Sequence, residues 1–298
     1  MRIVQITPGA GDSFYCENCL RDNALTAALR RAGHDAMLVP LYLPLLGDRP
    51  DAPPPSPVFF GGVNVYLQQR FGLFRRAPRW VDRLFDSPRL LRWVSRRVGM
   101  TDARVLGETT LSMLRGEHGR QRKELERLVA FLGAGDGIDV VCLSNALLVG
   151  LVRRIKEALD VPVVCIGQDE DAFLDDLPEP FRRRAWEETR RRAEDVDCFV
   201  PVSRYYADVM RRRFGLPDEK VRVVSPGVDL EGYSPAPAPP DPPAVGYLSL
   251  MSRSKGLDTL AEAFILLKRR PEFQAVRLRV SGGTTAGDEP FLGDVRAR

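Results

Sequence analysis

The stretch Val245-Gly-Tyr-Leu-Ser-Leu-Met-Ser-Arg-Ser-Lys-Gly256 decides the fold of this chain. Its first half predicts a short strand, and its polar second half predicts a turn that opens a helix. Two cations, Arg253 and Lys255, lie inside the turn. Backbone N–H groups at the start of a helix attract anions, and two neighbouring cations suit a diphosphate better than a single carboxylate. We therefore expect a phosphate-binding turn here.

Segments before and after this turn add further motifs, and these motifs follow one another in a fixed order along the chain. After the turn come a predicted helix with apolar residues at helical spacing and a strand with a glycine pair, Val276–Gly283. Upstream, Val202-Ser203 precedes a predicted helix, and Val221-Arg-Val-Val-Ser-Pro-Gly-Val-Asp229 follows that helix and leads toward a proline-rich joint. In this order the motifs resemble the family 4 glycosyltransferases of the GT-B fold, most strongly over residues 196–283.

The resemblance implies an α/β protein with a GT-B-like architecture. It assigns residues 1–234 to a Rossmann-like, acceptor-side domain with a parallel sheet, and residues 235–243 to a proline-rich linker. Residues 244–298 then form the incomplete start of a second Rossmann-like domain that binds the nucleotide-sugar. Members of the family are retaining, metal-independent transferases, so the implied partners are a nucleotide-sugar donor and a glycan or lipid-linked acceptor, and no cofactor is expected.

The resemblance also implies roles for single residues. The set comprises donor-binding Gly9, Gly11, Arg253, Lys255, Gly256 and Gly282, acceptor-side Asp12 and Ser13, and interdomain Ser203, Gly227 and Asp229. Two departures stand out. Leu250 occupies the position where the family usually has an arginine, and the donor-binding glutamates of the family would lie beyond Arg298. A non-catalytic fragment that binds sugar or nucleotide is therefore an alternative function.

The chain opens with a strand, a glycine turn, a helix and a second strand, as in Rossmann-like folds. The strands are expected at Arg2–Thr7 and Ala36–Val39, and the helix at about 18–32. The apolar face expected for this helix consists of Leu20, Ala24, Ala28 and Leu29. An NAD site is disfavoured, because Phe14 replaces the third glycine of G-x-G-x-x-G and no acidic residue closes the second strand. A plain turn without a ligand remains the alternative for this loop.

A polar cluster, Gln168-Asp-Glu-Asp171, follows the predicted strand Val161–Gly167. Open α/β sheets bind ligands at the carboxyl ends of their strands. In the resembling family a histidine near the reacting sugar commonly matches Gln168, so Gln168 and Asp169 are the catalytic candidates. Alternatively, Asp169 and Asp171 hold a divalent metal, or the cluster caps the next helix, which begins near Pro180.

Charge and cysteine content restrict the expected partners and the expected cellular location. The chain has 44 basic and 40 acidic residues and a net charge of +4, without an extended basic footprint for nucleic acid. Residues 70–97 combine nine arginines with aromatic residues, which favours either an anionic membrane surface or ordinary packing with solvated arginines. Five cysteines and no signal peptide indicate the cytoplasm, with association at the inner membrane face as a hypothesis.

Two further predictions concern local chemistry. Cys16 and Cys19 form a lone C-x-x-C pair, which favours buried thiols at the start of a helix over a redox or zinc site. The run Phe181–Glu194 predicts a charged helix whose arginines form solvated i,i+4 pairs with glutamates.

Overall fold

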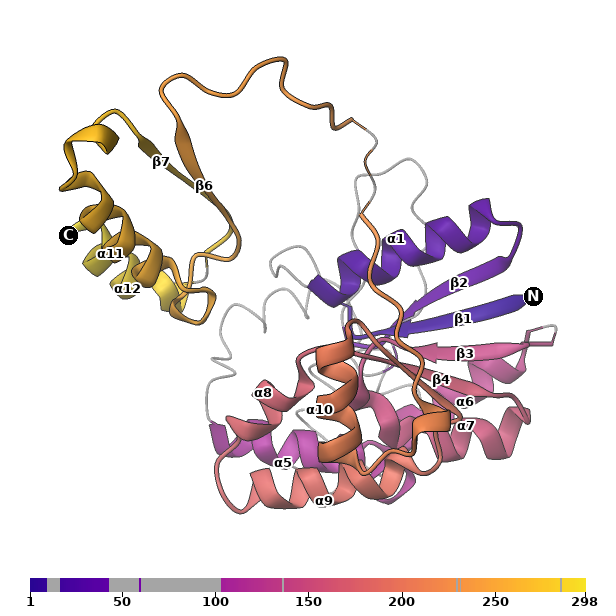
Figure 1. Cartoon of the computed structure of the whole chain (residues 1–298). Coiled ribbons are helices and arrows are strands. Elements are labelled where there is room, and N and C mark those ends of the chain that lie inside the picture. Colours follow the sequence, from indigo (N-terminus) through magenta and orange to yellow (C-terminus); the bar gives the residue numbers. More distant parts are fainter. Residues whose placement is uncertain are drawn as a thin grey trace, which may run out of the picture. The chain divides into compact units, whose positions relative to one another are not determined.

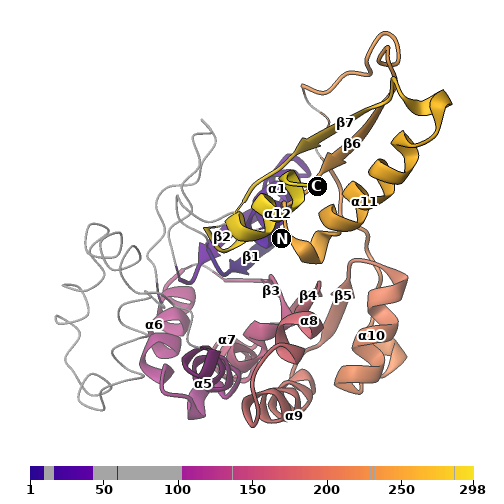
Figure 2. The ribbon, with the colours of Figure 1, turned by 90° about the vertical axis from the view of Figure 1, so that its left-hand side faces the viewer.

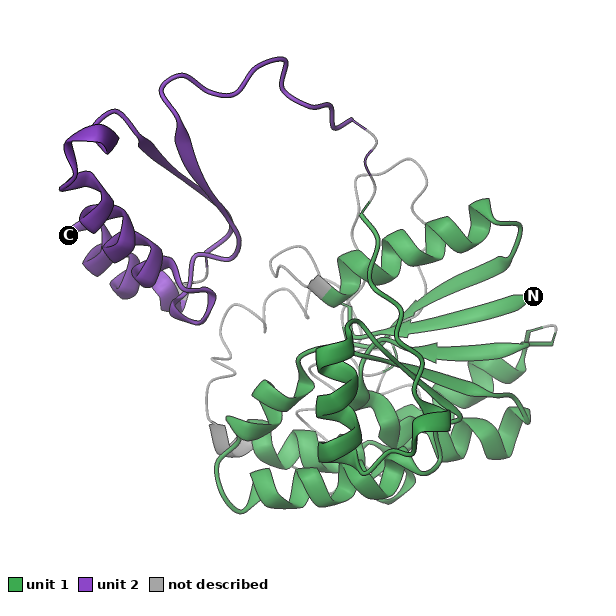
Figure 3. Cartoon of the chain, viewed as in Figure 1, with its two compact units in different colours: residues 1–229 green, residues 230–298 purple. Residues whose placement is uncertain are grey.

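The computed structural model describes residues 1–9, 17–42, 59, 103–135, 137–228, 230, 232–284 and 286–298. The chain divides into two compact units, Met1–Asp229 and Leu230–Arg298 (Figure 3). The basic aromatic segment 70–97 and the predicted residues Gly11, Asp12, Ser13 and Asp229 lie outside the described residues. Among the helices that are described, none combines the length and apolarity needed to cross a bilayer.

Unit 1 is built on a five-stranded parallel sheet in the order β2-β1-β3-β4-β5 (Figure 1). The strands are β1 Arg2–Thr7, β2 Asp35–Pro40, β3 Val140–Leu143, β4 Val163–Gly167 and β5 Cys198–Pro201. They are short and rich in valine, isoleucine and leucine, as expected for strands covered on both faces. The strand order reverses at β1, which pairs with β2 on one side and β3 on the other.

Helices connect and cover these strands. They are α1 Glu17–Arg31, α5 Ala103–Leu114, α6 Arg122–Gly133, α7 Val152–Leu159, α8 Glu170–Asp175, α9 Phe181–Ala193 and α10 Arg204–Phe214, with 3-10 turns at Gly116–His118, Ala146–Leu151 and Asp218–Lys220. Helix α1 lies on one face of the sheet, and α5, α6, α7 and α9 lie on the other (Figures 1 and 2). Val4 and Ile6 of β1 point into the hydrophobic core on this second face.

Helix α1 forms where predicted, but its predicted apolar face is wrong. Leu20 is 55% exposed. The buried residues are instead Cys19, Asp22 and Thr26, which share one face at helical spacing. They meet the side of β1 that alternates with Val4 and Ile6, and the Thr7 hydroxyl donates to Cys19 Sγ at 3.7 Å. The prediction failed because Gln5 and Thr7 of β1 are buried polar residues on the side of β1 that alternates with Val4 and Ile6.

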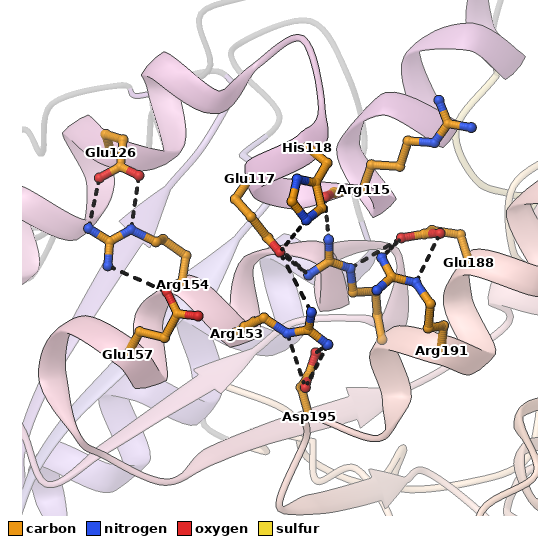
Figure 4. A network of polar contacts seen from close by, with 11 residues as sticks. Arg115, Glu117, His118, Glu126, Arg153, Arg154, Glu157, Glu188, Arg191 and Asp195 are labelled. Atoms are coloured by element: carbon orange, nitrogen blue, oxygen red, sulfur yellow. Dashed lines mark hydrogen bonds and ion pairs between the residues drawn. The ribbon is translucent and has the colours of Figure 1, made fainter.

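Helix α9 also departs from its prediction, because Arg192 is fully buried rather than solvated. Its Nη1 donates to both carboxylate oxygens of Glu117 at 2.9 Å, its Nε donates to Glu188, and its Nη2 donates to the Arg115 carbonyl (Figure 4). Next to this cluster, Arg153 pairs with Asp195. The network joins α9 to the 3-10 turn Gly116–His118 and to α7. Arg183 and Glu187 do form the predicted exposed i,i+4 pair.

The described residues of unit 2 form two parallel strands and two helices, of which both strands and the first helix were predicted from the sequence. They are β6 Ala244–Leu248, α11 Leu257–Lys268, β7 Arg277–Ser281 and α12 Glu289–Arg296, with 3-10 turns at Arg253–Lys255, Pro271–Phe273 and Ala286–Asp288. Leu257 and Ala261 are the buried residues of α11. The strand, crossover helix and parallel strand form one βαβ unit, which places the turn before α11 at the carboxyl end of β6.

Candidate functional site

The carboxyl ends of β1, β3 and β4 carry the polar cluster of unit 1. Ser144 continues β3, and its amide donates to the Ile6 carbonyl of β1 at 2.9 Å. Gln168 follows directly after β4. The strand order reverses at this place, between β1 and β3, and ligands of open α/β sheets bind outside the carboxyl ends of strands at such a reversal. The cluster therefore lies where the fold favours a ligand.

Arg21 of α1 connects these strand ends. Its Nη1 donates to Gln168 Oε1 at 2.7 Å, and its Nη2 donates to the Ser144 carbonyl at 2.6 Å. Both Nε and Nη2 donate to Asp22 Oδ1, at 3.1 and 2.9 Å. The Arg21 side chain is only 13% exposed and that of Asp22 is fully buried. Sequence reasoning missed both residues.

Gln168 and Asp169, the catalytic candidates, occupy different environments. Gln168 is half-buried and held by Arg21, whereas Asp169 is exposed. Asp169 has a left-handed backbone, with φ 63° and ψ 17°, and precedes α8 without a capping hydrogen bond from its side chain. Asparagine and aspartate tolerate this conformation better than most residues. The structure brings Gln168 into the polar cluster and leaves the Asp169 carboxylate in solvent.

Glu170 is a buried residue whose role sequence reasoning also missed. Its Oε1 accepts from the Ala146 amide at 3.0 Å, and its Oε2 accepts from the Gln168 amide at 2.8 Å and the Tyr206 hydroxyl at 2.6 Å. The Tyr206 oxygen accepts in turn from the Glu170 amide. Burial raises the pKa of Glu170 and outweighs these hydrogen bonds, which lower it. Glu170 thus joins the ends of β3 and β4 to α10.

The thiols near this cluster are not activated. Burial, and then the Asp22 charge, raise the pKa of Cys142 to about 11. Burial also raises the pKa of Cys165. Thiolates are the nucleophilic and metal-binding form of cysteine, so raised values favour an inert role. Cys19 is buried in the first turns of α1, as predicted, and Cys16 lies outside the described residues.

The remaining candidates of unit 1 do not join the Arg21 cluster. Gly9 is buried with φ 78°, in the left-handed region that glycine adopts freely, just after β1. Ser203 is the N-cap of α10, and its Oγ accepts from the Tyr206 amide at 3.1 Å. Gly227 is exposed. The structure gives Ser203 a capping role that requires no ligand.

In unit 2, the predicted phosphate turn has the expected local geometry. Arg253–Lys255 forms a 3-10 turn, and Gly256, with φ 74°, leads into α11. The Tyr247 hydroxyl donates to the Leu250 carbonyl at 2.8 Å and to the Lys255 carbonyl at 3.4 Å, which fixes the turn against β6. The Gly256 amide donates to the Arg253 carbonyl, so a ligand would meet the next amides of α11 instead.

The two cations of this turn differ. Arg253 pairs with Asp258 at 3.2 Å and its guanidinium lies 5.2 Å from the centre of the Phe291 ring. Lys255 is exposed, and its ammonium has no partner in the described part of the chain. Lys255 is therefore the cation of this turn that is available to an anion without breaking an existing ion pair.

Gly282 has a structural reason to be glycine. A Cβ atom at this position would lie 1.6 Å from the Ser249 carbonyl oxygen. The loop after β7 therefore packs directly on the backbone that leaves β6, and the Met251 amide donates to the Gly283 carbonyl at 2.9 Å. Close backbone approach explains this glycine without a bound phosphate.

The described residues contain no group of three histidine, cysteine, aspartate or glutamate side chains that could hold a metal ion. Asp169 and Asp171 flank Glu170, whose carboxylate is already used by Ala146, Gln168 and Tyr206. The cluster after β4 therefore offers two carboxylates rather than a preformed oxygen cage, which is what calcium sites usually provide.

Comparison with known proteins identifies sequences and structures to which this chain is similar. Residues 93–231 match the model of Glycosyltransferase Family 4. The structure of Anabaena HepE in complex with UDP matches with a TM-score of 0.54 and 13% sequence identity, over 100% of this chain and 65% of HepE. Sucrose-phosphate synthase from Thermosynechococcus elongatus matches with a TM-score of 0.53 and 13% identity, over 99% of this chain and 68% of the synthase. No curated protein sequence matches the chain.

These matches confirm the predicted family resemblance and the GT-B-like α/β fold. This chain spans about two thirds of the length of the two proteins, 65% and 68%. At 13% identity the structural likeness concerns the fold alone.

Proposed function

Residues 93–231 of this chain match the model of Glycosyltransferase Family 4, and from this match we propose that the protein transfers a sugar from a nucleotide diphosphate sugar to an acceptor hydroxyl. We propose that the transfer retains the configuration of the sugar and needs no metal. The acceptor is a glycan or a lipid-linked saccharide. The basic segment 70–97 would favour an acceptor at an anionic membrane surface.

The exposed ammonium of Lys255 at the turn before α11, which has no ion-pair partner among the described residues, is the observation that carries this proposal. A diphosphate there would meet one cation and the first amides of the helix, which together favour an anion. Arg253 would add a second positive charge by leaving Asp258, since its own guanidinium is 69% exposed although the Asp258 side chain is half-buried. The same turn would bind a neutral ligand poorly.

In unit 1 we assign the sugar-facing role to Gln168. Its amide is neutral at every physiological pH, so it donates a hydrogen bond but cannot serve as a general acid or base. A retaining reaction is compatible with this chemistry when the departing phosphate itself accepts the proton of the incoming hydroxyl. Asp169 is the neighbouring carboxylate, and its exposure leaves it free to contact an acceptor.

Calorimetric titration with UDP-, GDP- and ADP-glucose, and with NAD as the competing ligand class, tests the proposal. UDP-glucose is the first probe because the HepE structure contains UDP. Lys255→Ala should weaken the binding of the preferred nucleotide by about 1.5–3 kcal/mol, roughly 10- to 150-fold, as expected for a hydrogen bond to a charged group.

Arg269→Ala is the matched control, because Arg269 is an exposed cation at the other end of α11. It should leave the dissociation constant within about twofold. Absence of binding by all three nucleotide-sugars would overturn the proposal, as would an unchanged affinity in Lys255→Ala. Binding without transfer to any hydroxyl acceptor would instead support a non-catalytic sugar- or nucleotide-binding protein.

The anomeric configuration of the product, followed by proton NMR as the reaction proceeds, tests retention. Transfer that persists in EDTA would support the metal-independent form of the proposal. Activity that returns only with Mn²⁺ or Mg²⁺ would point instead to Asp169 and Asp171 as metal ligands.

A further inference from the structure

Arg21 fixes which atom of the Gln168 amide faces outward. A guanidinium only donates hydrogen bonds, so the Gln168 atom that lies 2.7 Å from Arg21 Nη1 must be the amide oxygen. The opposite orientation would set two donors against each other. The Nε2 group of Gln168 consequently points away from Arg21, and it has no acceptor among the described residues.

Arg21 is itself held firmly in place. Its Nε and Nη2 both donate to Asp22 Oδ1, and Nη2 also donates to the Ser144 carbonyl. Ser144 is anchored to β1 through its amide, which donates to Ile6. With Asp22 fully buried and Arg21 only 13% exposed, the guanidinium has one position from which it reaches Gln168. This arrangement joins α1 to the ends of β3 and β4.

Asp22 gives this cluster an unusual feature. Its Oδ2 is buried and lacks a hydrogen-bond partner among the described residues. Buried carboxylates usually satisfy both oxygens, because an unpaired buried polar atom is destabilising. If position 22 served stability alone, a carboxylate with both oxygens paired or an apolar side chain would be expected there. The Asp22 carboxylate instead directs the Arg21 guanidinium toward Ser144 and Gln168.

We propose that Arg21 is a positioning residue that presents Gln168 Nε2 as a hydrogen-bond donor to an oxygen of the bound sugar, with Asp22 holding Arg21 in place. This inference rests on the proposed sugar transfer, in which Gln168 contacts the sugar. Arg21 need not touch the substrate. Its effect passes through the orientation of one amide, and this distinguishes it from a cation that binds phosphate directly.

NMR tests the positioning step without any ligand. The side-chain amide signals of Gln168 are assigned by their loss in Gln168→Glu. In the wild-type protein we expect two well-dispersed signals with a heteronuclear NOE close to that of the folded backbone. In Arg21→Lys, which keeps the charge beside Asp22 but cannot reach all three partners, the two signals should move toward the values of exposed glutamines and lose their NOE.

Arg30→Lys is the matched control. Arg30 also lies in α1 and also ties it to the sheet, since its Nε donates to the Ala36 carbonyl at 2.7 Å. It should leave the Gln168 signals unchanged. If Arg21→Lys unfolds the protein, the double variant Arg21→Gln/Asp22→Asn removes the guanidinium and the buried carboxylate charge together. The same loss of order at Gln168 is expected there.

Binding tests the functional step. The contribution of the sugar to binding is measured as the ratio of the dissociation constant of UDP to that of UDP-glucose. If the corresponding GDP or ADP compounds bind more tightly, the ratio is measured with that pair. One neutral hydrogen bond corresponds to roughly 2- to 10-fold in this ratio. Gln168→Glu, which has no donor, and Arg21→Lys should each lower the ratio by that factor. The double variant Arg21→Lys/Gln168→Glu should lower it no further.

The possible results separate the two proposals. Unchanged Gln168 signals in Arg21→Lys overturn the positioning role whether or not a nucleotide-sugar binds. A ratio that falls in Gln168→Glu but not in Arg21→Lys also overturns it, while the proposed function stands. Ordered Gln168 signals that depend on Arg21, with no binding of any nucleotide-sugar, would instead show that the proposed function fails and would remove the assignment of the sugar as the ligand.

Discussion

Two arginines of unit 1, Arg192 and Arg21, have very different partners. Arg192 is fully buried in α9 and Arg21 is 13% exposed in α1. Every guanidinium nitrogen of both side chains donates to an acceptor. The partners of Arg192 are two glutamates and a carbonyl, whereas those of Arg21 include the neutral Gln168 amide, whose Nε2 group has no acceptor among the described residues. The Arg192 guanidinium is thus surrounded by acceptors that it satisfies, and the Arg21 guanidinium orients an amide that keeps a donor.

The difference separates contacts of unit 1 that stabilise the fold from contacts that we propose serve its function. The Arg192 network links α9 to the turn that carries Glu117, and its charges are compensated within the protein. Each region also holds a buried carboxylate oxygen with no hydrogen-bond partner among the described residues, Asp22 Oδ2 beside Arg21 and Asp195 Oδ2 beside the Arg192 network. The two regions differ in position, because the Arg21 cluster lies at the strand ends, where α/β sheets bind ligands. This position supports a functional interpretation of Arg21, and the compensated charges around Arg192 support a structural one.

Removing Arg192 should produce the largest loss of stability. Arg192→Met keeps much of the side-chain volume but leaves Glu117 and Glu188 without their buried cation. Removing one partner of a buried ion pair typically costs about 3–5 kcal/mol. Urea unfolding, followed by tryptophan fluorescence to which Trp186 of unit 1 contributes, measures the loss. Arg183→Gln, which removes one partner of an exposed i,i+4 pair, should change stability by less than about 0.5 kcal/mol.

A loss below about 1 kcal/mol in Arg192→Met would show that apolar packing replaces the network, as happens in some proteins with buried ion pairs. The contrast between the two arginines would then disappear.

The two glutamates of these regions should respond to pH in opposite directions. Burial raises the pKa of Glu170, so its stabilising contribution is complete below the ordinary value of 4.5 and is lost as the pH rises through the folded pKa. For Glu117, burial alone would raise the pKa, but hydrogen bonds and the Arg192 charge together lower it. Its contribution is present above 4.5 and is lost as the pH falls through the folded pKa.

Unfolding free energies of the wild type, Glu170→Gln and Glu117→Gln, measured between about pH 3 and pH 8, test this expectation. The advantage of the wild type over Glu170→Gln should fall as the pH rises, and its advantage over Glu117→Gln should grow. Slopes of the same sign would mean that the two carboxyl groups share one kind of environment.

Ser203 tests, with a smaller expected effect, whether a polar residue at the carboxyl ends of the strands stabilises the fold or binds a ligand. Its Oγ caps α10 by accepting from Tyr206, so Ser203→Ala should cost about 1 kcal/mol of stability. Ser203→Asp should retain most of it, because aspartate is an equally good N-cap. Unchanged stability in Ser203→Ala, together with weaker binding of nucleotide-sugars, would favour the interdomain role implied by the family resemblance.

The sequence predicted elements well where the physical signal is local. Short apolar runs predicted β1, β2 and β4, and the helix predicted after Val202-Ser203 is α10. The short helix α8 was not predicted, because its residues were interpreted as a carboxylate-rich loop. The turn at Arg253–Lys255 was predicted from charge and position, and it has the expected geometry.

The candidate site was harder to predict, because its contacts join residues far apart in the chain. Gln168 was proposed, but its partner Arg21 lies 147 residues away. Nothing local distinguishes Arg21 in a chain with 44 basic residues. A usable signal did exist: Cys19, Asp22 and Thr26 recur at helical spacing, and Gln5 and Thr7 alternate along β1. Together they indicate a polar layer between helix and sheet.

Gln168 is restrained at both ends, since Glu170 accepts from its amide at 2.8 Å and Arg21 donates to its side chain at 2.7 Å. A side chain that must be immobilised on binding typically costs about 0.5–1.5 kcal/mol of affinity. If Gln168 contacts the sugar as proposed, the protein bears that entropy loss during folding, before the sugar binds. The contact would then be preorganised, and a hydroxyl of the wrong stereochemistry would not be met by a second rotamer of Gln168.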